Sequence, residues 1–492
     1  MSDEPANLSS ELRRAEQQVE RRSAVFKKEL SLVDLALTQI LFIVGLPWIG
    51  TAGKLGPSHI VLWLAAIVLF YLPSAAVVIY LNRLMPLEGG LYQWAKLGFN
   101  EALGFMVAWN LWLFVILNTS EIGLQATTSL AYALGPSAAW MAETKWLIGL
   151  LSGVIIGGLM LVAVLGLGVG KWIHKAGAVL MLVIFATILV LPLVNYAGGH
   201  ISQYRPLATE MPALSLFSLN ILGKLGFGAL GGFEYVAIHA GECRDPVRTI
   251  GRSVLVAAPV IALMFILGTS SVLALLRPEA IDLIAPIPQV LSAGFQALGS
   301  FAYVVPLTIL AFLWIRIAQS SVQFTGNTRL PMVAGWDRLL PEWFTRLDER
   351  RKTPVNSILF VGAMTLAFGL LGMIGVGQQE AFQLLWNASG VFYALTYLVM
   401  FAIPLWGLRR MNERAPLWLR CAAGSGFLMT ALYVMLSVFP IISVTSRLSF
   451  ALKIAGVIVA ANGLGVLLLI VAERRRARAA SPPPANDAAI PR

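Results

Sequence analysis

Four charged residues lie inside long apolar runs of the sequence, namely Glu121, Lys224, Glu234 and Arg316. A charge at the centre of a bilayer costs at least ~2.5–3.5 kcal/mol, so such residues pair with one another or face a cavity. Two acids and two bases sum to zero, which favours mutual pairing. Glu121 and Glu234 are candidates for carrying a proton beside a binding site. Lys224 or Arg316 can instead occupy a cation site or meet a ligand carboxylate.

Polar residues recur every three or four positions around two of these charges. The stripes comprise Asn118, Glu121, Gln125 and Thr128 in one run, and Arg316, Gln319, Ser320 and Gln323 in another. This spacing places each set on one face of a helix, which must point toward protein or a water-filled cavity. The alternative that stays open for each stripe is a hydrogen-bonded seam that only holds helices together.

Two apolar runs contain helix-breaking sequence. One includes Pro47, which lacks an N–H and clashes with the preceding turn, so a kink or unwinding is expected there. The other has four glycines in the seven residues 226–232, which weakens a helix, although close helix packing is an alternative reason for them. The candidate binding residues at the two breaks are Gly45, Leu46, Pro47, Trp48, Ile49 and Gly50, and Gly228, Ala229, Leu230, Gly231, Gly232 and Phe233.

The composition indicates which elements position these residues. Hydrophobic residues make up 58% of the 492 residues, charged residues only 12%, and the mean hydropathy is +0.77. A helix of about 20 apolar residues spans a bilayer, and continuous rather than alternating apolar runs exclude an outer-membrane barrel. We therefore predict an all-α polytopic membrane protein with about 12 transmembrane helices. The runs are 34–53, 60–81, 103–133, 146–169, 176–196, 213–241, 253–276, 289–327, 356–375, 381–406, 421–443 and 453–472.

The net charge of +11 reports orientation rather than a polyanionic partner. Of 36 Lys and Arg residues, 28 fall on one side of the predicted spans, six on the other and two inside runs. This asymmetry predicts that both termini are cytoplasmic and that the protein lies in the inner or plasma membrane. Residues 1–30 are expected to form a charged cytoplasmic segment and residues 476–492 a disordered cytoplasmic tail. Nucleic acid is not an expected partner, whereas the lipid bilayer is.

The spacing of the breaks predicts the architecture. They occur in the first and sixth runs, five spans apart, so the two runs cross the membrane in opposite directions. This is the LeuT-type 5+5 inverted repeat with discontinuous helices 1 and 6, whose half-helix N-termini bind anionic groups. The expected units are a core over 31–406, made of repeats 31–196 and 213–406, followed by helices 11 and 12 over 407–475.

Three stretches carry a resemblance to a known family. They are Pro86–Trp94 with Gly98; Gly232–Glu234 followed by Gly241–Pro246; and Thr328–Arg329, Gly335–Pro341 and Thr353–Pro354. In order and on this topology, they resemble the amino-acid permeases of the amino acid–polyamine–organocation superfamily. The resemblance covers roughly residues 30–472.

The resemblance implies a permease that imports or exchanges an amino acid or related amine by alternating access. It implies that the substrate carboxylate meets Gly45–Gly50 and that the amino group meets carbonyls of Ala229–Glu234. Pro47 departs from the family's G-x-G break, so one carboxylate-binding N–H is missing or the pose is shifted. Asp337-Arg338 departs from the family's aspartate-glycine pair.

Other function classes fit less well. A membrane sensor or receptor usually adds a soluble output domain, and the longest cytoplasmic segments in this chain are about 30 residues. An embedded enzyme is disfavoured because the sequence shows neither an H-E-x-x-H motif nor a nucleophile constellation, and no cofactor or metal is expected. A transporter of a non-amino-acid organic cation stays open. So does coupling to protons, to sodium, for which no site is readable, or to a counter-substrate.

Overall fold

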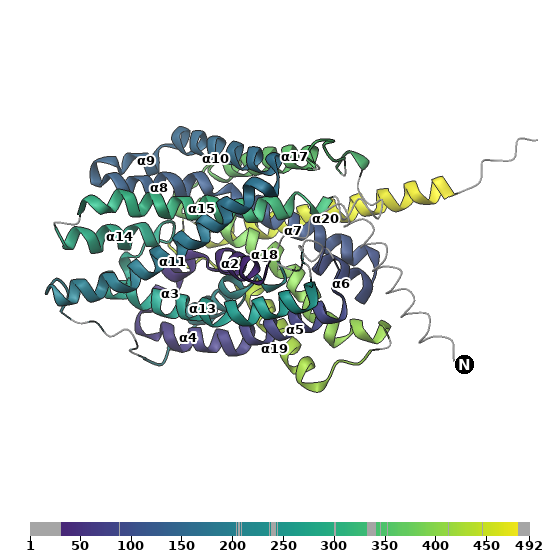
Figure 1. Ribbon diagram of the computed structural model, residues 1–492, viewed down its shortest axis with the longest axis horizontal. Coiled ribbons are helices and arrows are strands. Elements are labelled where there is room, and N and C mark those ends of the chain that lie inside the picture. The colour runs from purple at the N-terminus through teal and green to yellow at the C-terminus, as the bar shows by residue number, and fades with distance from the viewer. Residues whose placement is uncertain are drawn as a thin grey trace, which may run out of the picture.

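The computed structural model describes residues 31–480, apart from residues 88, 203, 205–206, 208, 236, 238–242, 244, 300–301, 332–340, 345, 352, 412 and 445. The described chain is a bundle of helices that run along one common direction (Figure 1). In that view α10 and α17 lie along one edge and α4, α5 and α19 along the opposite edge, with α2 and α3 between them. The all-α prediction is confirmed.

The helices of the bundle follow one another along the chain, with short connections between most of them. They are α2 (Leu32–Ile43), α3 (Leu46–Gly53), α4 (His59–Ala66), α5 (Leu72–Leu84), α6 (Leu91–Gly98), α7 (Glu101–Ser120), α8 (Ile122–Leu134), α9 (Trp140–Glu143), α10 (Lys145–Leu165), α11 (Leu167–Ala197), α12 (Leu216–Gly223), α13 (Pro246–Leu275), α14 (Pro286–Ala297), α15 (Val305–Asn327), α17 (Val355–Gly372), α18 (Gln378–Leu405), α19 (Leu417–Leu436) and α20 (Arg447–Ala480). Two π-helical segments, η2 (Ile67–Tyr71) and η4 (Lys224–Ala229), continue α4 and α12.

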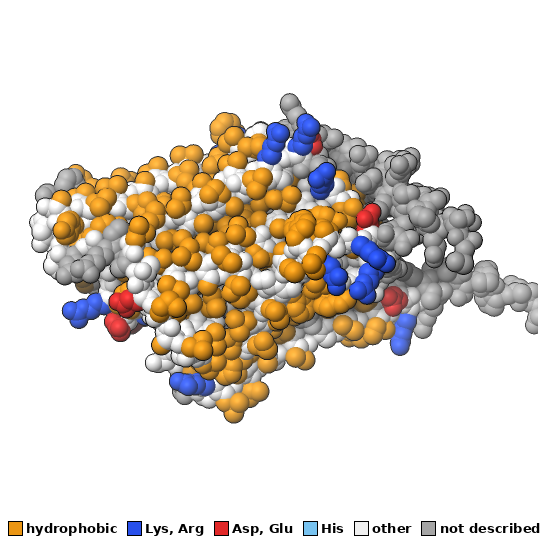
Figure 2. Space-filling view, turned by 90° about the horizontal axis from the view of Figure 1, so that it is seen from below, with side chains coloured by type: hydrophobic (Ala, Val, Ile, Leu, Met, Phe, Trp, Pro, Cys, Tyr) orange, Lys and Arg blue, Asp and Glu red, His pale blue; other side chains and the backbone are white. Residues whose placement is uncertain are grey.

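The number of spans agrees with the sequence. Eleven helical stretches in the described residues are long and apolar enough to cross a membrane, and the bent pair α2 and α3 makes a twelfth. The outer surface is apolar, with exposed side chains such as Val154 on α10 and Val459 on α20. Figure 2 shows hydrophobic atoms over the middle of one face and charged side chains at its two ends. The chain is therefore a multi-pass membrane protein. The inverted repeat stays a prediction.

The predicted eighth span was wrong. The eighth run, 289–327, is two helices, because Gly299 adopts φ +56° after α14 and ends it, and Pro306 lies in the first turn of α15. Positive φ at a glycine is a common helix terminator. At the C-terminal end, α20 continues to Ala480 and so includes the first residues of the predicted segment 476–492, whose remainder lies outside the described residues.

The first predicted break exists and has a simple cause. Helices α2 and α3 meet at 44°. Pro47 has no N–H for the Ile43 carbonyl, its partner in an unbroken helix. The N–H of Gly45 turns to the Ile43 oxygen instead, at 2.6 Å, and so leaves the Leu41 carbonyl outside the helical ladder. Pro47 itself lies in the first turn of α3, where a missing N–H costs nothing.

The second predicted break lies at Gly231 and Gly232. The π-helix η4 ends just before it, and a short 3₁₀ turn over residues 233–235 follows. Gly232 has φ +135°, and a Cβ there would lie 2.8 Å from Phe42 and Ile43 of α2. Only glycine has both the conformation and the space for this close approach.

A third interruption was not predicted. The run 103–133 forms one helical span, Glu101–Leu134, as predicted, but a single turn residue separates α7, which ends at Ser120, from α8, which starts at Ile122. The residue between them is Glu121, with φ −84° and ψ 0°. The nearest glycine is Gly123, inside α8, and it was not singled out from the sequence. A functional candidate therefore lies at the junction of two helices rather than within one.

Candidate functional site

A small cavity lies between the two predicted breaks. Its volume is about 60 Å³. The first broken span, called helix 1 and made of α2 and α3, contributes Gly45 and Trp48. The span with the second break, called helix 6 and beginning with α12 and η4, contributes Gly228 and Gly231. The other lining residues come mainly from α7, α15 and α18: Phe42, Ile43, Phe114, Asn118, Phe227, Arg316, Gln319, Gln323, Trp386, Ser389, Gly390 and Tyr393. The breaks are thus neighbours in space, as the sequence reasoning expected.

Trp48 connects the two breaks. A Cβ on Gly228 would lie 2.5 Å from the Trp48 ring, and one on Gly45 would lie 2.6 Å from it. The indole therefore fits between two glycines that belong to the two different breaks. On a further side Trp48 contacts Trp386 of α18, with ring centroids 5.2 Å apart. Gly228 was predicted as part of a weak helix and Gly45 as a candidate binding residue beside Pro47, and in the structure both make room for this ring.

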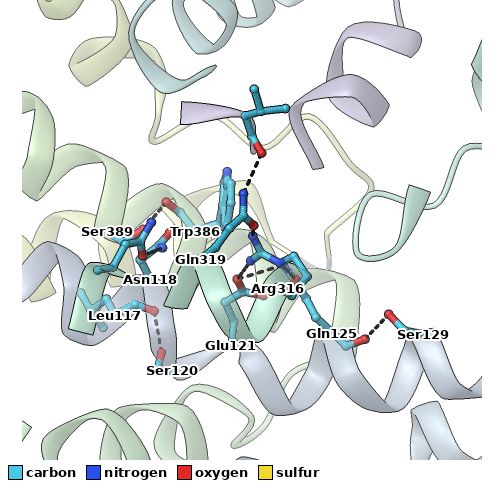
Figure 3. A network of polar contacts seen from close by, with 12 residues as sticks. Leu117, Asn118, Ser120, Glu121, Gln125, Ser129, Arg316, Gln319, Trp386 and Ser389 are labelled. Carbon is cyan, nitrogen blue, oxygen red and sulfur yellow. Dashed lines mark hydrogen bonds and ion pairs between the residues drawn. The ribbon is translucent and has the colours of Figure 1, made fainter. Parts of the chain in front are cut away.

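A buried ion pair lies beside the cavity. Arg316 Nη2 of α15 is 3.2 Å from Glu121 Oε1, and the two side chains are 7% and 1% exposed. Gln125 of α8 completes the contact, because its Nε2 donates to Glu121 Oε1 at 2.9 Å and its Oε1 accepts from Arg316 Nε at 2.5 Å. Figure 3 shows Arg316 surrounded by Glu121, Gln125 and Gln319. Both polar stripes therefore face each other across α7, α8 and α15.

The stripe on α15 also reaches helix 1. Gln319 Nε2 donates to the carbonyl oxygens of Leu41 at 2.7 Å and Val44 at 2.8 Å, while Arg316 Nη1 donates to Gln319 Oε1 at 2.6 Å. One turn further along α15, the Gln323 Oε1 atom accepts from Asn118 Nδ2 at 2.7 Å. Every predicted member of the two stripes that carries a carboxylate, guanidinium or amide group takes part in these contacts.

Glu234 lies just past the second break and is held by two tyrosines. Tyr393 donates to Glu234 Oε1 and Tyr397 donates to Glu234 Oε2, both through their hydroxyl groups. The Tyr397 oxygen in turn accepts from the Gly232 N–H at 2.6 Å. Glu234 is only 2% exposed. A backbone N–H freed at the break is thus joined to a buried carboxylate through one hydroxyl.

The expected pairing of the four charges is only half right. Glu121 and Arg316 pair, but Glu234 binds tyrosines and Lys224 binds neither acid among its described contacts. Lys224 Nζ donates to Asn387 Oδ1 at 2.7 Å and lies 5.8 Å from the centre of the Tyr433 ring. Lys224 is 1% exposed.

The predicted break residues divide into two groups. Gly45, Trp48, Gly228 and Gly231 line the cavity. The cavity lining does not include Leu46, Pro47, Ile49, Gly50, Ala229, Leu230, Gly232 or Phe233. Gly50 has a packing role instead, since a Cβ there would meet Pro286 of α14 at 2.8 Å.

Residues of α18 were missed by the sequence reasoning. Trp386, Ser389 and Tyr393 line the cavity, and Tyr397 holds Glu234. The signal was present, because Tyr393 and Tyr397 are four residues apart and so share one helix face. Of the motif residues, Gly241, Glu242, Arg244 and Gly335–Leu340 lie outside the described residues. No group of three or more His, Cys, Asp or Glu side chains in the part of the chain that the structure describes forms a possible metal site.

A bundle of membrane-spanning helices with a cavity between two broken helices is an arrangement typical of secondary transporters. The sequence comparisons agree with this class. A family model described as amino acid permease matches residues 30–461. The chain belongs to this family of amino acid permeases. Members of the family are transporters, so the chain is a permease-type transporter of the amino acid or amine class and not an enzyme.

Individual relatives are distant. The chain is 22% identical over 388 residues to an uncharacterized transporter of Legionella pneumophila, which covers 76% of this chain and 80% of the relative. It is 24% identical over 324 residues to cationic amino acid transporter 7, chloroplastic, of Arabidopsis thaliana, covering 62% of this chain and 54% of the relative. It is 19% identical over 408 residues to the probable agmatine/putrescine antiporter AguD of Lactococcus lactis, covering 82% and 84%.

Proposed function

We propose that the chain is a secondary transporter that carries a small amino acid across the cell membrane by alternating access. The observation that carries this proposal is the cavity at Gly45, Trp48, Gly228 and Gly231, where both breaks meet. Both termini are proposed to be cytoplasmic, because basic residues concentrate on one side of the spans.

The charge of the cavity favours a substrate with a carboxylate. Arg316 is a cation and lines the cavity, whereas Glu121 and Glu234 are absent from its lining. The N-terminus of α3 adds a partial positive charge, and with Pro47 in its first turn the Leu46 N–H is the donor nearest to the break. Trp48, Trp386 and Tyr393 offer aromatic faces for an ammonium group.

The size of the cavity favours a small substrate. One buried water needs a cavity of roughly 10–15 Å³, so this cavity of about 60 Å³ holds on the order of five waters. A small amino acid has a similar number of heavy atoms. Agmatine, one of the two compounds named for the Lactococcus lactis relative, is larger and would need the surrounding aromatic side chains to move. Exchange of such an amine is the second candidate, and that relative's name favours it.

Coupling is proposed to use a proton or a counter-substrate. Glu121 and Glu234 are buried carboxylates. Glu121 pairs with Arg316, Glu234 accepts a hydrogen bond from Tyr393, and both of these partners line the cavity. Protonation of either would alter contacts at one break. Lys224 lies before the second break, at the start of η4. It is proposed to stabilise the half-helix made of α12 and η4 against α18 and α19 rather than to contact substrate.

The direct test is uptake and exchange of labelled amino acids and amines by the purified protein in proteoliposomes. We expect a small neutral amino acid to be transported best and Gly228→Ala to lower its transport at least tenfold, because the new methyl group would collide with Trp48. Gly157→Ala on α10 is the matched control, since a Cβ there has nothing within 4 Å and transport should be unchanged. Neither uptake nor exchange of any compound in the panel would refute the proposal.

A further inference from the structure

The break in helix 1 leaves two backbone carbonyls that its own helices do not satisfy. The Gly45 N–H turns away from the Leu41 oxygen and donates to the Ile43 oxygen instead. Trp48 N–H donates to the Gly45 oxygen at 3.0 Å and therefore not to the Val44 oxygen, its partner in a regular helix. Buried carbonyls without a partner are costly in a membrane protein, so something must meet them.

The partner is one side-chain amide. Gln319 Nε2 lies 2.7 Å from the Leu41 oxygen and 2.8 Å from the Val44 oxygen, and Gln319 is 2% exposed. The C-terminal end of a helix carries a partial negative charge. Carbonyls at such an end, in a discontinuous transmembrane helix, are a typical place for a bound metal cation. In this chain the positive end of a carboxamide fills that position.

The amide orientation is fixed by charge. A carboxamide can turn its oxygen or its nitrogen toward a neighbour. Arg316 Nη1 donates to Gln319 Oε1 at 2.6 Å, which leaves only the NH₂ group to face the helix 1 carbonyls. Arg316 is held in turn by Glu121 at 3.2 Å and by Gln125 at 2.5 Å. A fixed positive charge is thereby relayed to the break through the dipole of Gln319.

We propose that Gln319 is a positioning residue that holds the helix 1 break in place of a metal cation, so that substrate binding and transport need no sodium. This inference rests on the proposed function and deepens it, because it assigns the element that holds Gly45 and Trp48 at the cavity. Pro47 and Gln319 act together in this arrangement. The proline marks the break at which the Gly45 and Trp48 N–H groups turn away from the Leu41 and Val44 oxygens, and the glutamine satisfies those two oxygens.

The first test replaces sodium in the wild-type protein. Substrate exchange in proteoliposomes is measured with Na⁺ on both sides and then with N-methylglucamine instead. We expect equal KM and equal maximal rate within about twofold. Exchange that requires Na⁺ would overturn the inference while leaving the proposed function intact. Absence of exchange under both conditions, across the whole panel, would instead be a failure of the proposed function.

The second test removes the amide. Gln319→Ala takes away both hydrogen bonds to the helix 1 carbonyls, together with the one accepted from Arg316, and leaves a space beside the carbonyls. Without Na⁺ we therefore expect KM to rise about tenfold. Na⁺ should then recover most of the loss, since a cation can enter the vacated position. Gln319→Met fills the space but has no hydrogen-bond donor, so we expect the same rise in KM, and Na⁺ should not reverse it. Wild-type behaviour of Gln319→Ala, or a loss that Na⁺ does not relieve, would overturn the inference.

The control is another glutamine on a neighbouring helix. Gln296 of α14 donates to Ser292 Oγ of its own helix at 2.9 Å, so Gln296→Ala removes a carboxamide that takes no part in the hydrogen bonds at the break. KM and the absence of a sodium effect should stay as in the wild type. If Gln319→Ala does not fold, the wild-type substitution of Na⁺ and the Gln319→Met variant still decide the question.

Discussion

The two helix breaks that border the cavity are satisfied in opposite ways. At the break in helix 1 the free backbone groups are carbonyls, and they accept from Gln319, which Arg316 orients. At Gly232 the free group is an N–H, and it donates to Tyr397, which in turn donates to Glu234. One break is connected to a buried cation and the other to a buried anion, each through a single neutral side chain.

The comparison explains why the buried charges are arranged as they are. A half-helix C-terminus has a partial negative charge and favours a nearby positive charge, so Arg316 suits the carbonyl side. At the second break the Gly232 N–H donates to the Tyr397 hydroxyl, which must donate in turn, so a carboxylate such as Glu234 is a suitable acceptor there. Glu121 then neutralises Arg316, but only through one oxygen, since its Oε2 is buried without a hydrogen-bond partner in the described structure.

The largest expected effect comes from removing the cation at the first break. Arg316→Met leaves Glu121 as an unpaired buried carboxylate and Gln319 without its orienting donor. Breaking a buried pair in this way costs about 3–5 kcal/mol, so we expect a sharp loss of thermal stability and of folded protein. The melting temperature in detergent measures it. The double variant Glu121→Gln, Arg316→Met should recover much of the stability but not transport. A single variant as stable as wild type would contradict the role of the pair.

A smaller effect is expected at the second break. Tyr397→Phe keeps the ring but removes the hydroxyl, which leaves the Gly232 N–H unpaired and Glu234 with one donor fewer. An unsatisfied buried donor costs about 1–3 kcal/mol, so we expect a moderate fall in melting temperature and a fall in transport. Tyr433→Phe is the control, because the Tyr433 hydroxyl is also buried but bonds neither to the break nor to a buried carboxylate in the described structure. Equal melting temperatures for both variants would show that the Tyr397 relay contributes nothing.

The sequence identified much of this arrangement because membrane helices constrain it strongly. Pro47 predicted the first break through the loss of one N–H, and the three- and four-residue spacing predicted the facing stripes that hold Arg316 and Gln319. The glycines of helix 6 predicted the second break. These inferences use local chain geometry, which short stretches of sequence determine.

The errors arise where local periodicity gives no information. Glu234 was expected to pair with a base, but the break at Gly232 lies between Lys224 and Glu234 and resets the helical phase, so their spacing does not tell which neighbours they face. The turn residue Glu121, inside the span Glu101–Leu134, is not marked by a proline. The tyrosines of α18 depend on which helix packs beside helix 6, and a single sequence does not specify that contact.

The smallest structural change tests which of the two breaks carries a proton. Glu121→Gln and Glu234→Gln keep the size of each side chain and remove its charge. If uptake is driven by protons, it rises in the wild type as the external pH falls, and the variant at the proton-carrying site should lose this dependence. Because Glu121 has an oxygen without a partner while both oxygens of Glu234 accept hydrogen bonds, we expect the flatter profile in Glu121→Gln.

Uptake in proteoliposomes at a series of external pH values measures this, with counter-substrate exchange at equal pH as the control for intact binding. Profiles that match the wild type in both variants would remove the two carboxylates as proton carriers and favour exchange. A flat profile in Glu234→Gln alone would move the coupling to the second break.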